Sequence, residues 1–410
     1  MDSRRQFLLG LGGCACCLGR TAQADVLTTD VPALFSAGYQ PTDQDERGLW
    51  QDTERLEDEL RHSDRLLRSA ELNGYLRGIL ERLLGRPAPE IRIYIVREAY
   101  FNALMAPTGL MIVHSGLLAR VRNEAQCAAV LGHEAGHYFR KHSVEGLRSR
   151  RRKSAAIAVV SAVANIAAGA AYQQGYNGGS WIDLANSINQ SIVLSYFHFN
   201  RSQESEADAF GISLLSKAGY APTAASDVWR QTIEERKQSA KLRKRRYSDD
   251  SESAFSTHPP NEERMQDLAD TAEHLRHQGS EATFEGRGEW HSAIEPHLPA
   301  LLDEQIKRND PGASLYLIDN LARDGWTGLL HFQKGEVYRL RGAPEDDVKA
   351  AAAYADSIQM TDAPPEAWRA HGYALLKSGQ NAEARDALSR YLELQPSASD
   401  ANMVRFTLAQ

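Results

Sequence analysis

The chain has 410 residues, of which 42% are hydrophobic and 25% are charged, and its formal net charge is −7. This composition is typical of a globular protein of two to three domains, and it excludes collagen-like, mucin-like and wholly disordered chains. A mean hydropathy of −0.47 and the lack of an apolar run of about 20 residues argue against a polytopic membrane protein. The acidic balance argues against a nucleic-acid binder.

Residues 1–24 read as an export signal rather than as part of a fold. Arg4 and Arg5 precede an apolar stretch that ends in a small-residue cleavage site, which is typical of twin-arginine signals. A generic secretory signal is one alternative, and a lipoprotein modified at Cys14 is another. The signal contains three of the four cysteines. An exported chain would therefore keep only Cys127 and form no internal disulfide.

The next segment predicts helices followed by a small sheet. Apolar residues recur at helical spacing over 43–85, which predicts two helices. The alternating residues 91–96 predict a strand. Residues 102–105 and 110–114 flank an Ala-Pro-Thr-Gly turn and predict a hairpin.

Three further helices are expected before the C-terminal part. Asn123 is a typical N-cap with Gln126 as its capping-box partner, and this helix is expected to run to about His142. The Ala-rich stretch 155–171 predicts a buried or surface-lying helix, with insertion into a membrane or contact with its surface as the alternative. Another helix is expected from near Asn200, ending at an Ala-Gly C-cap.

The rest of the chain combines a charged loop with a helical repeat. The run 236–253 changes from basic to acidic and predicts a solvated loop, with contact to an anionic surface as the alternative. Five residues fall at the spacing of a tetratricopeptide unit: Trp368, Gly372, Leu375, Ala384 and Pro396. Gly335 and Tyr338 resemble the same unit in an earlier copy. Such helix pairs stack on one another, although an ordinary α-helical hairpin domain is the alternative.

The first chemical motif is His133-Glu134-Ala-Gly-His137 on the capped helix. Residues four apart lie about 40° apart around a helix, so both imidazoles can reach one Zn²⁺. Glu134 lies beside them and can accept a proton from a metal-bound water. A solvated helix is the alternative interpretation. His142 lies about 140° round the same helix from His137, so we expect it to point away.

Zinc needs a third protein ligand, and the best candidate is Glu204. Asp208 shares its helix face four residues later and can accept an N–H from a zinc-bound histidine. Arg201, on the same helix, is expected beside this pair. Glu206 lies about 200° round from Glu204 and is expected to face solvent.

With both motifs in order, the sequence resembles the zinc metallopeptidases of the CAAX prenyl protease and HtpX type over roughly 45–270. Other stretches also match that family: Asn102-Ala103, Pro107-Thr-Gly109, Ser115-Gly-Leu-Leu118, Thr257-His258-Pro259 and Arg264. With an export signal in front and repeats behind, the layout is similar to the BepA-like periplasmic branch. The resemblance implies zinc on His133, His137 and Glu204, with Glu134 as general base.

Two further features have open interpretations. His258 can donate to a developing oxyanion, act as a fourth zinc ligand that closes the site, or have a structural role. Asn102 and Ala103 lie in a candidate edge strand that can bind an extended substrate, or that simply ends the sheet.

We therefore expect a mainly α (α+β) chain with a zincin-type peptidase domain containing a small sheet. The expected divisions are an N-terminal segment over 25–42, the peptidase domain over 43–275, a linker over 276–295 and tetratricopeptide-like repeats over 296–410. The expected function is a metalloendopeptidase with one Zn²⁺ per chain, acting on envelope proteins in the periplasm. Its repeats would dock substrates or the outer-membrane protein assembly machinery. The alternatives are an adaptor or chaperone with a closed, weakly active zinc site, and a membrane-anchored quality-control protease.

Overall fold

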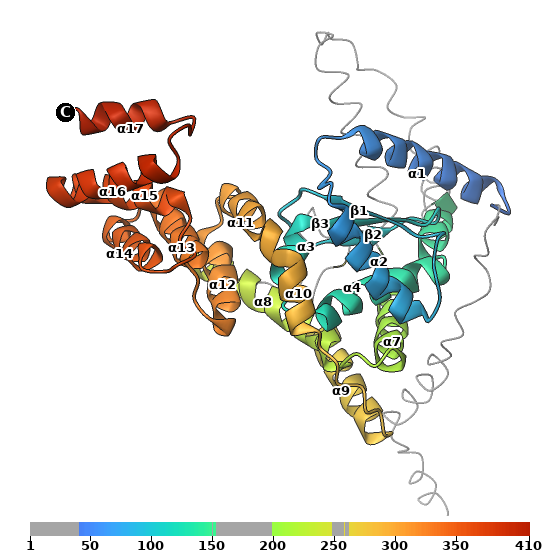
Figure 1. The fold of residues 1–410 in the computed structure, drawn as a ribbon. Helices are drawn as coiled ribbons and strands as arrows, with labels where there is room; N and C mark the ends of the chain where they lie inside the picture. Colours follow the sequence, from blue (N-terminus) through green and yellow to red (C-terminus); the bar gives the residue numbers. More distant parts are fainter. Residues whose placement is uncertain (1–40, 150, 153–198, 248–257, 259–261) are drawn as a thin grey trace, which may run out of the picture.

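In the computed structural model, the described residues are 41–149, 151–152, 199–247, 258 and 262–410. The expected export signal, the stretch 155–171, and Thr257 and Pro259 lie outside these ranges. Figure 1 shows a helical chain in which a small sheet lies at one end and the C-terminal helices lie at the other. None of the helices in the described ranges is long and apolar enough to cross a membrane.

A three-stranded sheet organises the first part of the chain. Two helices, α1 (Gln44–His62) and α2 (Ala70–Leu84), precede β1 (Arg92–Val96), β2 (Ala103–Met105) and β3 (Leu110–His114). The strand order is β1-β3-β2, in which β3 pairs in parallel with β1 and antiparallel with β2. The predicted hairpin is confirmed, and β3 lies between β1 and β2 in the sheet that the described residues form.

The two faces of the sheet are covered by different helices. Ile93 and Ile95 of β1 belong to the main core, which also contains the apolar residues of α2 and of the helix that follows the sheet. Tyr94 lies on the opposite face and packs in a smaller cluster with Leu56 and Leu60 of α1. This alternation is the period-two pattern of a strand that is buried on both sides.

Among the described residues, this part of the fold also contains α3 (Ser115–Arg120), α4 (Glu124–Phe139), α7 (Arg201–Lys217), α8 (Thr223–Leu242) and α9 (Glu262–His277). Further helical residues lie over 142–149. The Asn123 side chain accepts a hydrogen bond of 2.8 Å from the N–H of Gln126, as the sequence predicts. Every residue of α4 is buried, because the sheet, α2, α7 and α8 all contact it. This helix is therefore a central and rigid position for functional side chains.

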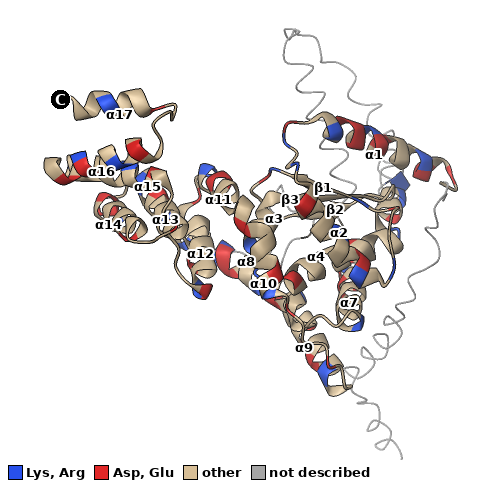
Figure 2. Cartoon of the chain, in the orientation of Figure 1, with Lys and Arg blue, Asp and Glu red and all other residues tan. Residues whose placement is uncertain are grey.

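The C-terminal part is entirely helical in the structure. It contains α10 (Arg287–Ile294), α11 (Leu298–Lys307), α12 (Pro311–Leu321), α13 (Gly328–Arg341), α14 (Asp346–Ile358), α15 (Pro365–Lys377), α16 (Asn381–Leu394) and α17 (Ala401–Leu408), with 3₁₀ turns at Glu295–His297 and Ala322–Asp324. The predicted fold class, a mainly α chain with a small sheet and a helical C-terminal region, is confirmed. Basic and acidic residues are interspersed along the helices of both parts (Figure 2).

The helices after the sheet domain share its core. Leu301, Ile306 and Leu317 belong to the same hydrophobic cluster as the apolar residues of α4. Segment 276–295, expected as a linker, contains the end of α9 and all of α10. Its Trp290 is buried and donates from Nε1 to the carbonyl of Val121 at 2.9 Å.

Candidate metal centre

The centre depends on an unusually close approach of two helices. Gly136 lies between the two motif histidines of α4, and a Cβ at this position would lie 2.9 Å from the Cα of Ala207 in α7. A Cβ on Gly211 of α7 would lie 2.9 Å from the backbone nitrogen of His133. Only glycine leaves room for this contact, since carbon atoms in proteins normally approach to about 3.5–4.0 Å. The contact places the N-terminal end of α7 directly against the motif.

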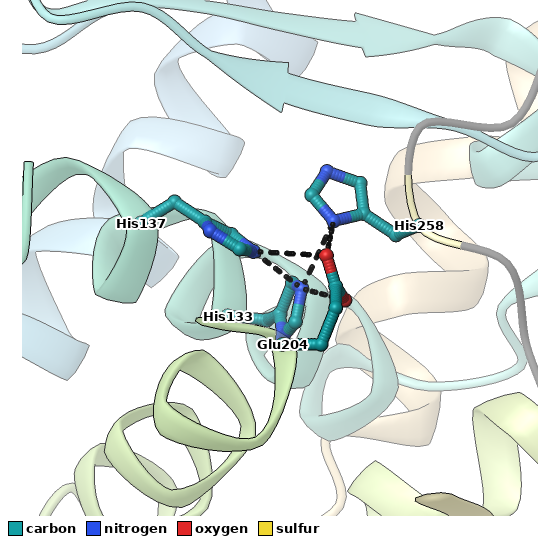
Figure 3. A group of neighbouring side chains, drawn as sticks. All are labelled: His133, His137, Glu204 and His258. Atoms are coloured by element: carbon teal, nitrogen blue, oxygen red, sulfur yellow. Dashed lines mark hydrogen bonds and ion pairs between the residues drawn. The ribbon is translucent and has the colours of Figure 1, made fainter. Parts of the chain in front are cut away.

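Four ligand atoms converge where these helices meet (Figure 3). The Nε2 atoms of His133 and His137 lie 3.0 Å apart. Nδ1 of His258 lies 3.3 Å from Nε2 of His133 and 2.8 Å from Oε1 of Glu204. Glu204 oxygens lie 3.4 Å from Nε2 of His133 and 3.6 Å from Nε2 of His137. All four side chains are buried.

The spacing of these atoms fits a zinc ion. Zinc binds nitrogen and oxygen ligands at about 2.0–2.2 Å in a tetrahedron, whose corners are therefore roughly 3.3–3.6 Å apart. The separations given above, 2.8–3.6 Å, lie within or somewhat below that range, and all four ligand atoms lie within 4.8 Å of one another. Three imidazole nitrogens and a carboxylate are also the ligand types that zinc prefers, and the alternative of four buried polar side chains in close contact without an ion would be costly.

The local charges set the ionisation of three of these side chains. Burial alone would raise the pKa of Glu204, but His258 and Arg264 hold it well below its ordinary value, so the carboxylate is ionised. Burial and the neighbouring His133 lower the pKa of His137 well below its ordinary value, so this imidazole is neutral. Burial opposes the proton on His133, yet Asp208 and Glu204 raise its pKa to about 10. A cation is thus favoured at Nε2 of His133, where zinc would take the place of the proton.

Asp208 and Arg264 contact the ligand side chains from outside the cluster. Oδ1 of Asp208 lies 2.8 Å from Nδ1 of His133, on the side of the ring away from the cluster. Arg264 of α9 donates to both oxygens of Asp208 at 2.8 and 2.9 Å, and its Nη1 lies 2.8 Å from Oε2 of Glu204. The guanidinium also lies 4.9 Å from the ring centre of Trp229. Such partners orient the ligands and raise their basicity.

His258 contacts both Glu134 and the ligand cluster. Its Nε2 lies 3.3 Å from Oε1 of Glu134, while its Nδ1 belongs to the cluster described above. Glu134 is only 1% exposed. Among the described residues, its second oxygen has no hydrogen-bond partner. The same imidazole therefore contacts a candidate general base and a candidate metal position.

The structure places two expected residues differently from the sequence analysis. Arg201 lies at the surface, where its Nη1 is 3.3 Å from Glu263, so it is not brought to the ligands. His142 does not point away, since its Nδ1 lies 2.9 Å from Nδ1 of His137. Helix α4 ends at Phe139 rather than near His142, and the angular argument therefore does not apply. Glu206 faces partly toward solvent, as expected, but its Oε2 lies 3.4 Å from Nε2 of His142.

The candidate substrate strand lies beside the centre. Ala103 begins β2, which contacts α4 and pairs with β3. Asn102 precedes β2, and its carbonyl accepts a hydrogen bond from the N–H of His114 at 3.1 Å. Both residues are buried. Both residues thus lie at a strand of the sheet that contacts the motif helix α4.

Two contributors have no individual signal in the sequence. Phe199 stacks on His137 with ring centres 3.8 Å apart, and it lies just before α7 rather than in either motif. Trp229 contacts Arg264 from α8. A single aromatic residue carries no pattern that distinguishes a metal site from a core position, so only the tertiary structure identifies these two.

The comparisons with known proteins agree with this geometry. A model of peptidase family M48 matches residues 67–272, which is half of the chain and includes His133, His137 and Glu204. The chain belongs to peptidase family M48. This confirms the zinc metallopeptidase family expected from the two motifs, and it identifies zinc as the cofactor of the four-residue cluster.

The relatives have diverged considerably from this M48 chain. It is 26% identical over 261 residues to the beta-barrel assembly-enhancing protease of Escherichia coli (strain K12), covering 61% of this chain and 50% of that protein. It is 33% identical over 137 residues to the mitochondrial metalloendopeptidase OMA1 of Arabidopsis thaliana, covering 33% of this chain and 24% of that protein. It is 27% identical over 186 residues to the metalloprotease LoiP of Escherichia coli (strain K12), covering 45% of this chain and 63% of that protein. The matched part thus spans half or less of the first two relatives.

Proposed function

We propose that this chain is a zinc-dependent endopeptidase of the cell envelope that hydrolyses peptide bonds of protein substrates. The observation that carries the proposal is the convergence of His133, His137 and Glu204 at zinc-ligand spacing with Glu134 buried beside them. Membership of family M48 supports it, and so do relatives named as a beta-barrel assembly-enhancing protease and as metalloendopeptidases.

The residues divide the reaction between them. His133, His137 and Glu204 would hold the ion, which when bound polarises the scissile carbonyl and acidifies a water. Glu134 accepts the proton of the attacking water and returns it to the leaving amine. Asp208 holds the His133 ring in the orientation and tautomer that present Nε2 to the metal. Asn102 and Ala103 help to bind an extended substrate beside the centre.

The geometry of His258 supports a closed resting state. A catalytic zinc site keeps one position open, whereas Nδ1 of His258 occupies the fourth corner of the cluster. The same ring contacts Glu134, so it also blocks the general base. Among the three roles considered for His258, we propose that of a fourth ligand that must leave before substrate binds. His258 would then regulate access rather than stabilise the oxyanion.

Glu134→Gln tests the proposed chemistry directly. Glutamine keeps the shape of the side chain but cannot accept the proton, so zinc content should remain at one ion per chain while cleavage of an unfolded protein substrate falls at least about 100-fold. Metal analysis and a peptide-release assay on the same sample provide both readouts. A variant that cleaves as fast as the wild type would refute the peptidase function and favour the adaptor alternative.

His258→Ala tests the closed state separately. If His258 fills the fourth position, its removal should raise the rate of cleavage of a short peptide while zinc stays bound by the three remaining ligands. If His258 instead donates to the oxyanion, the same variant should lose about 100-fold in rate. A faster variant together with an inactive E134Q would establish both parts of the mechanism.

A docking role for the helical region is supported by its repeated packing. A Cβ on Gly335 of α13 would lie 2.4 Å from the Tyr354 ring of α14, and a Cβ on Gly372 of α15 would lie 2.7 Å from Leu388 of α16. The two helix pairs thus use glycine at the same kind of contact, which is how tetratricopeptide units pack. We propose that these repeats dock substrates or the outer-membrane protein assembly machinery, and that the envelope compartment is the periplasm.

The adaptor and membrane-anchored alternatives have their own tests. An adaptor would retain every measurable activity as E134Q, because its function would not require hydrolysis. A membrane-anchored protease would stay in the pellet after carbonate extraction, and the mass of the mature N-terminus would show cleavage near residue 24 or modification of Cys14. A chain released by carbonate and cleaved near residue 24 is the outcome that we expect.

A further inference from the structure

A histidine outside the ligand cluster, His142, contacts the metal ligand His137. His142 is 1% exposed, and its Nδ1 lies 2.9 Å from Nδ1 of His137, the ring nitrogen that faces away from the ligand cluster. On its other side, Nε2 of His142 lies 3.4 Å from Oε2 of Glu206 in α7. The three side chains form a row that leads from the ligand cluster toward the surface, where the Glu206 side chain is 37% exposed.

The backbone after α4 makes this contact possible. The helix ends at Phe139, and Lys141 adopts a left-handed conformation with φ of 56°. Few residues other than glycine take this conformation, and it interrupts the helical geometry just before His142. Helical residues resume at His142, and the N–H groups of Val144 and Glu145 donate to the carbonyl of Lys141 at 3.0 and 3.1 Å.

Neighbouring side chains hold His142 in this position. Its carbonyl accepts a hydrogen bond from Nε2 of Gln203 in α7 at 3.4 Å. Phe199 stacks on His137 and lies 6.0 Å, centre to centre, from the His142 ring. The contact between the two histidines is therefore enclosed on the side of α7 and of Phe199, which favours a single arrangement of the rings.

We propose that His142 is a positioning residue for the metal centre, which fixes the ring orientation and tautomer of His137 by accepting a hydrogen bond from its Nδ1. The protons can be assigned along the row. A metal-binding Nε2 leaves the His137 proton on Nδ1, which donates to Nδ1 of His142. Nδ1 of His142 is then an acceptor, so its own proton lies on Nε2 and points to Glu206.

This arrangement gives the two ligand histidines different support. His133 faces the ionised Asp208, which is itself held by Arg264. His137 faces a neutral imidazole, and the carboxylate of Glu206 follows only behind that ring. A neutral acceptor polarises a ligand less than a carboxylate does. We therefore expect His142 to contribute to zinc affinity at the lower end of the range known for partners of metal ligands.

Zinc affinity of the full-length chain tests the inference without reliance on activity. His142→Phe keeps an aromatic ring but removes the acceptor, whereas His142→Asn keeps an acceptor oxygen near the position of Nδ1. In competition with a chelator of known affinity, we expect H142F to bind zinc about tenfold more weakly than the wild type and H142N to recover most of that loss. His371→Phe is the matched control, since it makes the same change in α15. Its zinc affinity should equal that of the wild type.

The possible outcomes separate this inference from the proposed function on which it rests. A wild-type chain that binds no zinc would overturn the proposed function, whereas equal zinc affinity in the wild type and H142F would overturn only the role of His142. Equal loss in H142F and H142N would also overturn it, because it would indicate ring packing rather than hydrogen bonding. If H142F fails to fold, Glu206→Ala provides the test instead, because Glu206 lies at the surface. A loss of about threefold in the zinc affinity of this variant supports the hydrogen-bonded row from His137 through His142 to Glu206, and an unchanged affinity refutes it.

Discussion

Gly136→Ala offers a sharp test of how the fold brings the metal ligands together. The new Cβ would lie 2.9 Å from the Cα and 3.1 Å from the carbonyl oxygen of Ala207, and both are backbone atoms that cannot rotate away. Ordinary carbon contacts are about 3.5–4.0 Å. Helices α4 and α7 would therefore have to separate by roughly 0.6–1.1 Å at this point.

A separation of this size is large compared with the tolerance of a metal site. Zinc–ligand distances vary by only about 0.2 Å, and Glu204 of α7 must reach the two histidines of α4. Overpacking of this kind costs about 1–3 kcal/mol. If zinc binding requires the helices to return to their present spacing, that strain corresponds to roughly a 5- to 150-fold loss of zinc affinity.

Chelator competition and urea unfolding of the zinc-free chain measure the two effects separately. Gly78→Ala in α2 is the matched control, because a Cβ at that helical position meets no atom within 4 Å. Removing a glycine from a helix interior should stabilise the control by about 0.5–1 kcal/mol without changing its zinc affinity. Full zinc affinity in G136A would refute the conclusion that close helix packing positions Glu204.

Two further predictions concern ionisable side chains. Arg264→Leu leaves the Asp208 and Glu204 carboxylates without their shared cation, so unfolding of the zinc-free chain in urea should show a loss of about 3–5 kcal/mol. Arg264→Lys should lose less, and equal losses would show that the charge is unimportant. Burial and the nearby Arg65 lower the pKa of His114 to about 4, below the ordinary value of 6.5. Because the unfolded chain then takes up the proton first, stability should fall by up to about 3 kcal/mol as pH falls from 6.5 to 4. His114→Gln should remove this part of the pH dependence, which unfolding curves at several pH values would detect.

Local patterns in the sequence account for a large part of the centre. The placement of His133, Glu134 and His137 on one helix depends only on helical geometry, and Asn123 starts that helix as its side chain predicts. The hairpin before it follows from a turn between two short segments, which is also a local signal. These features involve residues close in sequence, so no knowledge of the tertiary packing is needed to expect them.

The tertiary structure decided which distant residues complete the centre. The sequence predicts Arg201 beside the ligands because both lie on one helix, whereas the packing of α9 against α7 brings Arg264 to Glu204 instead. The left-handed backbone of Lys141 turns His142 onto His137, although uninterrupted helical spacing predicts the opposite. Such contacts depend on where a helix ends and on how closely two helices approach. Both are set by the whole core, because burial and steric exclusion act between residues far apart in the chain.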